Sequence, residues 1–148
     1  MEDAYIDARA PDGNFGRADR LVVRQGATAA ALLWFDLESI PAGISIKEAR
    51  LRLYAVGRNQ PGELFMSIAK VVTRWDPLHV TWVRSTATDG WAQPGANGIG
   101  HDRAGVSYAT AELKDERQWV VWDIGALVQE WLAEPASNHG LMILGEAS

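Results

Sequence analysis

The chain has 148 residues, 47% of them hydrophobic and 22% charged, which predicts one folded domain over residues 1–148 and excludes intrinsic disorder. The formal net charge of −5 argues against a nucleic-acid partner, because that affinity comes from clustered Lys and Arg. The absence of cysteine excludes disulfides and thiolate metal sites, and no apolar run approaches the ~20 residues that span a bilayer, so we expect no membrane partner.

Alternation of apolar and polar residues with a period of two predicts short β-strands along the first half of the chain. We expect strands at residues 21–23, 31–35, 49–56 and 64–69. In the third, Leu51 and Leu53 share one face, while Arg50 and Arg52 point to the other. Gly and Pro turn signals separate these runs, at residues 11–14, 24–26, 40–43 and 60–62. Strands at this spacing predict an all-β sandwich or barrel.

Residues 85–107 are of a different kind, rich in Gly, Ala, Asp and Thr, with Trp91 as the one large apolar residue. We expect a long loop here, and loops of this length in small domains are usually functional or held in place by contacts.

One short helix is expected near the C-terminus, at residues 124–133. Asp123 can cap its start, Leu127, Val128 and Trp131 recur at helical spacing, and Pro135 ends it. Apolar runs at residues 119–122 and 141–144 predict a strand on either side of the helix.

Seven tryptophans are a high number for this length, and indole rings can form a platform on which sugar rings stack. Burial in the core is the alternative, and we favour it for the four in strand or helix settings, Trp34, Trp75, Trp82 and Trp131. Trp91, in the long loop, and Trp119, which faces away from Trp122 in its strand, are the candidate glycan-binding residues.

No motif marks a catalytic site. The carboxylates show no pairing typical of a glycosidase, the three histidines lie far apart, and no serine stands in a nucleophile elbow. We therefore expect no catalytic residues, no enzymatic activity and no required cofactor. Asp12 and Asn14 are candidate ligands of a structural calcium ion, with an ordinary turn as the favoured alternative.

Strings along nearly the whole chain, in the same order, resemble DNRLRE-type domains. They are DAYI (3–6), NFG (14–16), ALLWFDL (31–37), IPAG (40–43), ARLRLY (49–54), WD (75–76), VTW (80–82), PGA (94–96), DR (102–103), WDI (122–124), LVQEWL (127–132) and NHGLMI (138–143). The resemblance implies a jelly-roll-like antiparallel β-sandwich without enzymatic activity. Similar domains are carbohydrate-binding modules of polysaccharide-acting proteins, some acting on alginate-like polymers, or repeat modules of surface and phage structural proteins.

The sequence departs from this family pattern in two places. Family members usually follow a secretory signal, whereas residues 1–7 have neither the basic nor the apolar region of one. Family members also continue from the GLMI-type strand into a closing strand, whereas here residues 145–148 follow directly. We therefore expect residues 1–148 to lack the closing strand of the family.

Two functions fit these observations. The first, which the sequence favours, is a non-catalytic structural or adhesive module. It would be an outward-facing virion subunit, such as a capsid-decorating or tail-associated protein, or part of a similar surface assembly. It would be located on the virion or the extracellular surface, with other protein subunits as partners. The alternative is a carbohydrate-binding module of a secreted polysaccharide-acting protein, with polysaccharide as its partner.

The missing closing strand also predicts how the chain assembles. An open strand edge is a template for pairing with another chain, so we expect a homo-oligomer in which residues 1–9 of a neighbour are a candidate donor strand. The alternative is that residues 1–6 or 104–113 fold back and cover the edge of their own sheet.

Overall fold

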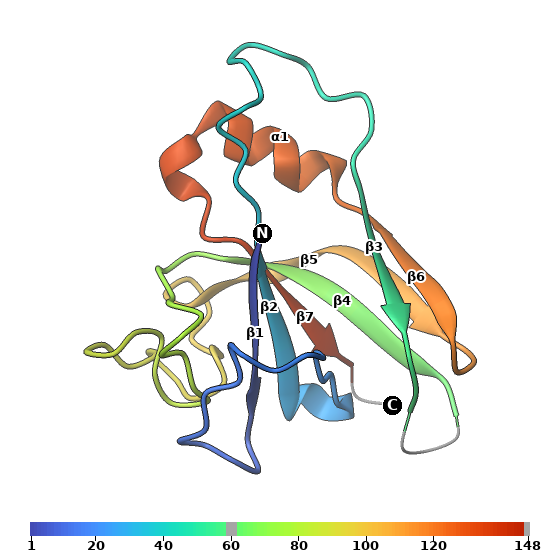
Figure 1. The fold of residues 1–148 in the computed structure, drawn as a ribbon. Helices are drawn as coiled ribbons and strands as arrows, with labels where there is room; N and C mark the ends of the chain where they lie inside the picture. The colour runs from blue at the N-terminus through green and yellow to red at the C-terminus, as the bar shows by residue number, and fades with distance from the viewer. Residues whose placement is uncertain (59–61, 147–148) are drawn as a thin grey trace.

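The computed structural model of the protein describes residues 1–58 and 62–146, which form two antiparallel β-sheets and a single α-helix (Figure 1). The larger sheet has the strand order β1-β2-β7-β4-β5, with bounds β1 Glu2–Asp7, β2 Ala29–Trp34, β7 Leu141–Gly145, β4 Leu64–Val71 and β5 Arg103–Leu113. The smaller sheet pairs β3 (Arg50–Ala55) with β6 (Gln118–Asp123). The predicted all-β antiparallel architecture with one short helix is confirmed.

The smaller sheet and helix α1 (Gly125–Ala133) cover one face of the larger sheet, and together they enclose the inner core. Alternation places Leu33 and Ile68 of the larger sheet inward, where they belong to the same cluster as Leu51 and Trp122 of the smaller one. The indole N–H of Trp122 donates to the carbonyl oxygen of Met66 at 2.9 Å, so one buried hydrogen bond links the two layers.

Helix α1 forms where its periodicity predicted. The carboxylate of Asp123 accepts the N–H of Gly125 at 3.0 Å, and Leu127, Val128 and Trp131 are buried. A short 3₁₀ turn, Pro135–Ser137, follows the helix. No helix in the described part of the chain is long and apolar enough to cross a membrane.

Truncating Trp131 to Ala should lower the free energy of unfolding by about 3–5 kcal/mol, because it removes a large side chain that is 1% exposed in the inner core. Urea denaturation followed by circular dichroism measures this loss. The exposed Glu134 at the end of the same helix is the matched control, and Glu134→Ala should change stability little. A loss below about 1 kcal/mol for Trp131→Ala would mean that α1 is not docked on the sheet.

The opposite face of the larger sheet is covered by the connection between β4 and β5, residues 72–102, drawn in green to yellow in Figure 1. Trp75, Val80 and Trp91 of this connection pack in one buried cluster with Ile6 and Leu32 of the sheet. The loop predicted over residues 85–107 is therefore held by contacts, as expected. It ends earlier than predicted, because residues 103–107 already belong to β5, and the connection begins earlier, after β4 ends at Val71.

Asp102 organises the end of this connection. Its carboxylate is almost completely buried and accepts three main-chain N–H groups, from Ala92 at 2.8 Å, Gln93 at 3.0 Å and Gly98 at 2.9 Å. These bonds give three main-chain donors of the connection a carboxylate acceptor, which is among the stronger kinds of hydrogen bond in proteins.

Asp102→Asn should lower the free energy of unfolding by about 3 kcal/mol, because the amide nitrogen would face buried N–H donors that then lack an acceptor. Urea denaturation again gives the value. Asp115→Asn, at an exposed position, is the control for loss of a carboxylate. Equal stability of the two variants would contradict this assignment of Asp102.

Asn138 and His139 accept hydrogen bonds from two tryptophans on the same face of the larger sheet. The carbonyl oxygen of Asn138 accepts the indole N–H of Trp34 at 3.0 Å, and that of His139 accepts the indole N–H of Trp75 at 2.6 Å. Burial, together with the nearby positive charge of Lys70, lowers the pKa of the His139 imidazole below 6.5.

This shift makes stability depend on pH. The folded state resists protonation of His139, whereas the unfolded chain takes up the proton, so the free energy of unfolding should fall as the pH drops below about 6.5. Denaturation between pH 5 and 7 measures the decrease. In His139→Gln the decrease over this range should be smaller, and an identical pH profile for both proteins would contradict the assignment.

One expectation about strands needs correction. Residues 21–23 are not a strand, although Leu21 and Val23 do pack against the inner core. The first strand, β1, pairs with β2 of the same chain, and β5 pairs with β4 of the same chain. Both segments therefore belong to the larger sheet of their own chain, and neither pairs with β3, whose one partner in the described sheets is β6. Donation of residues 1–9 to a neighbour stays a prediction.

Candidate functional site

The outward face of the smaller sheet carries a group of exposed side chains at paired register positions. In β3 and β6, Tyr54 lies opposite Trp119 and Arg52 lies opposite Val121. Trp119 is 55% exposed and Tyr54 is 47% exposed, which are high values for aromatic side chains within strands. We call Arg52, Tyr54, Trp119 and Val121 the Trp119 platform.

The side chains of the platform hold one another in place. The rings of Tyr54 and Trp119 meet edge to face, with centroids 5.3 Å apart and planes at 69°. The guanidinium carbon of Arg52 lies 4.8 Å from the centroid of the Trp119 ring, in cation–π geometry. Contacts from two directions thus restrict the indole, although more than half of its surface remains open to solvent.

Charged side chains continue the platform along the same face. Arg50 lies opposite Asp123 in the strand register, and its Nε is 2.6 Å from a carboxylate oxygen of Glu48. Both partners of this ion pair are exposed, so it contributes little to stability. The arrangement offers a flat aromatic surface beside donors and acceptors of hydrogen bonds, which are the groups that recognise the faces and the hydroxyls of sugar rings.

Trp91, the other candidate glycan-binding residue, lies elsewhere. It is only 6% exposed, in the cluster between the 72–102 connection and the larger sheet, and its indole N–H donates to the carbonyl oxygen of Thr81 at 3.0 Å. The expectation that Trp91 is exposed is wrong, and the structure does not bring it together with Trp119. The faces of its ring are covered by this cluster, which we call the second core.

The tryptophans predicted to be in the core occupy it to different degrees. Trp131 and Trp75 are buried, while Trp34 and Trp82 are half-buried and pack against the second core. Trp122 is buried as well. Trp119 is therefore the exposed member of the seven.

Asn14 has a role in joining loops. Its side-chain amide donates to the carbonyl oxygens of Pro77 at 2.9 Å and Val80 at 2.8 Å, and its side-chain oxygen accepts the N–H of Gly16 at 3.3 Å. Asp12 is exposed on the same turn. Within residues 1–58 and 62–146, no three His, Cys, Asp or Glu side chains lie close enough to hold a metal ion, and calcium binding at Asp12 and Asn14 stays a prediction.

One cluster of titratable groups lies where α1 meets the larger sheet. Burial, with a hydrogen bond to Glu130, raises the pKa of Tyr108 to about 12, and the ammonium group of Lys70 is 3.8 Å from a carboxylate oxygen of the same Glu130. These contacts connect the helix to β4 and β5. Tyr108 is therefore not held in a form suited to proton transfer near neutral pH.

Arginines line a groove of about 710 Å³ at one end of the sandwich. Two of its four arginines have partners within the chain, because Arg24 forms a two-pronged pair with Asp7 at 2.8 and 3.0 Å and Arg58 donates to two main-chain carbonyls. The guanidinium of Arg24 lowers the pKa of the Asp7 carboxyl. The groove has no exposed aromatic ring comparable to Trp119.

Comparison with known families bears on the function of the chain. The family model of carbohydrate-binding module family 96 matches residues 1–90 of the 148. The chain belongs to carbohydrate-binding module family 96. No curated protein matches the chain. The match supports the carbohydrate-binding part of the resemblance drawn from the sequence, but not the DNRLRE-type name.

The match to family 96 includes β3 but ends before β6, so it contains Arg52 and Tyr54 but not Trp119. Alternation in residues 49–56 already placed the arginines on the solvent face, and the same alternation applies to Tyr54. What the sequence did not reveal was the register between β3 and β6, which brings Tyr54 and Trp119 together across 65 residues of chain.

Proposed function

We propose that the protein is a non-catalytic carbohydrate-binding module that binds polysaccharide on the Trp119 platform. The single observation that carries the proposal is an exposed indole braced by Tyr54 and Arg52, in a chain of family 96. A side chain this large and this exposed is costly to leave in water unless a partner covers it.

The platform is open, and this bears on the form of the ligand. It lies on the flat outward face of two strands, and nothing among its neighbours in the register closes it at either end. Such a surface suits the middle of a long chain of sugar rings, which can enter and leave at both ends, better than it suits the end of a chain held in a pocket.

The bracing of the indole favours binding. An indole that is already oriented loses little rotational freedom when a sugar ring stacks on it, so more of the contact energy appears as affinity. The side chains of Arg50, Arg52 and Asp123 can then direct hydrogen bonds to ring substituents from the same face.

Family membership supports the second of the two functions drawn from the sequence. The virion-subunit interpretation receives no support from the family match, and we do not propose it. The homo-oligomer likewise remains a prediction from the strand edge.

Removing the aromatic rings of the platform should weaken polysaccharide binding. We expect Trp119→Ala to reduce affinity at least tenfold, which corresponds to about 1.4 kcal/mol, and Tyr54→Ala to reduce it by a smaller factor. Affinity gel electrophoresis with a panel of neutral and acidic polysaccharides measures both the affinity and the preferred class of polymer.

Phe65→Ala is the matched control, because Phe65 is an aromatic side chain of similar exposure on the larger sheet, away from the platform. Its affinity should equal that of the unmodified protein. Undiminished binding by Trp119→Ala and Tyr54→Ala to every polymer that the unmodified protein retains would place the glycan site elsewhere.

A further inference from the structure

Asn97 and Gly98 form the one Asn-Gly pair of the sequence, and they lie in the connection that covers the outer face of the larger sheet. In such a pair the main-chain nitrogen of the glycine can attack the side-chain amide carbon of the asparagine, because glycine has no Cβ atom to hinder the approach. The other asparagines, Asn14, Asn59 and Asn138, precede Phe, Gln and His, whose side chains hinder the same attack. The covalent surroundings therefore make Asn97 the asparagine most prone to deamidation.

The reaction needs only the protein and water. The N–H of Gly98 loses its proton, its nitrogen forms a bond to Cγ of Asn97, and the bond from Cγ to Nδ2 breaks. The leaving nitrogen takes up a proton and departs as ammonia. Water then opens the cyclic imide at either carbonyl, which leaves aspartate or isoaspartate at position 97. Both products are negatively charged at neutral pH, whereas asparagine is not.

The turn around Asp102, residues 92–102, nevertheless uses both members of this reactive pair. A Cβ atom at Gly98 would lie 2.6 Å from Oδ2 of Asp102 and 2.8 Å from Cβ of Ala92, so no other residue fits at this position. The side-chain Nδ2 of Asn97 donates to the carbonyl oxygen of Pro94 at 2.8 Å, within the same turn.

The two groups that would react are each held by another partner. The N–H of Gly98 donates to Oδ2 of Asp102 at 2.9 Å, and both residues are buried. The side-chain oxygen of Asn97 accepts a hydrogen bond from Nη2 of Arg103 at 3.4 Å. A main-chain N–H that faces a carboxylate gives up its proton less readily, because the anion that forms would face a negative charge. The nitrogen must also turn away from Asp102 before it can reach Asn97.

We propose that the Asn97-Gly98 pair is a latent deamidation site, which the buried carboxylate of Asp102 keeps unreactive while the turn is closed. Opening of the turn frees the Gly98 nitrogen, and the reaction can then proceed. A carboxylate at position 97 would place an acceptor in front of the Pro94 carbonyl, where the structure has a donor, so the turn could not close as before. This inference does not depend on the proposed glycan site, which lies on the smaller sheet.

The rate of deamidation at Asn97 in the folded and in the unfolded chain measures the protection. Both samples, one in buffer and one in concentrated guanidinium chloride, are kept at the same pH and temperature, and peptide mapping by mass spectrometry follows the product at position 97. We expect the folded protein to react about 100-fold more slowly, because reaction requires the turn to open. Equal rates in the two samples overturn the proposal.

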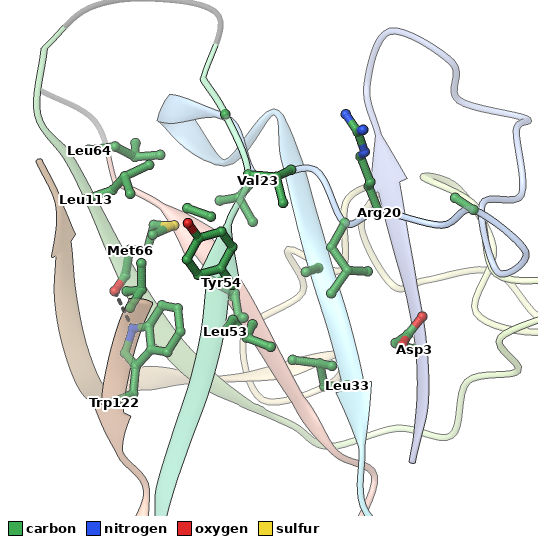
Figure 2. Close-up of a pocket in the computed structure, with 18 of the residues that line it drawn as sticks. Asp3, Arg20, Val23, Leu33, Leu53, Tyr54, Leu64, Met66, Leu113 and Trp122 are labelled. Atoms are coloured by element: carbon green, nitrogen blue, oxygen red, sulfur yellow. Dashed lines mark hydrogen bonds between the residues drawn. The ribbon is translucent and has the colours of Figure 1, made fainter. Parts of the chain in front are cut away.

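Asp102→Asn tests the source of the protection, because it removes the charge that faces the Gly98 nitrogen and leaves Asn97 in place. Trp131→Ala is the matched control, since it lowers stability through the inner core, on the opposite face of the larger sheet. Figure 2 shows part of this core around Trp122. We expect Asn97 to react about tenfold faster in Asp102→Asn than in Trp131→Ala, both under native conditions. Equal rates in the two variants would overturn the role of Asp102.

Amide hydrogen exchange of the unmodified protein gives a second measurement that does not require Asp102→Asn to fold. Exchange of the Gly98 amide and deamidation of Asn97 both need the turn to open, so their rates should rise together as denaturant is added. The Ile143 amide, in the buried strand β7, reports global unfolding. Deamidation that follows exchange of the Ile143 amide and not that of Gly98 would overturn the proposal.

Discussion

The structure depends on a sheet whose central strands are buried on both faces. All five residues of β7 are buried, as are five of the six in β2. A strand in this position must be apolar at every residue, and it is stable only if two separate layers cover it. The rest of the chain supplies these layers, with β3, β6 and α1 on one side and residues 72–102 on the other.

The two covering layers are built in different ways. The inner layer is regular secondary structure joined to the larger sheet through apolar packing and the bond from Trp122 to Met66. The outer layer is irregular chain, which cannot satisfy its main-chain groups by ladders and instead uses side chains such as Asp102 and Asn14. The platform is exposed because the smaller sheet is itself a covering layer, with its outward face turned to solvent.

Local sequence patterns predicted those elements that depend on local interactions. Helix α1 has a helical repeat and a terminating proline, and these place it to within one residue. The N-cap is Ile124 and not the expected Asp123, whose carboxylate instead accepts the N–H of Gly125 just before the helix. Alternation in residues 49–56 predicts strand β3, and the apolar run at residues 119–122 predicts strand β6. Residues 21–23 have the composition of a strand, yet a strand also requires a partner, which no local pattern can supply.

Prediction of the candidate site from the sequence is limited in the same way. The exposure of Trp119 followed from its alternation with Trp122, whereas the burial of Trp91 depends on how residues 72–102 fold back over the sheet. The alternation in residues 49–56 correctly places Arg52 and Tyr54 on the outward face of the strand. Their meeting with Trp119 is a matter of register between strands that are distant in the chain, and composition does not determine that register.

The way in which Asp102 holds the outer layer has a consequence for sequence change. Because its carboxylate binds N–H groups of the main chain, the identities of the side chains at Ala92 and Gln93 do not enter those bonds. Gly98 is different, since a Cβ atom there would lie 2.6 Å from the carboxylate oxygen. The turn around Asp102 is therefore a position where new side chains can be displayed at Ala92 and Gln93 on a fixed backbone. Asp102 and the glycines Gly95, Gly98 and Gly100 are its framework, since Gly95 and Gly100 have positive φ.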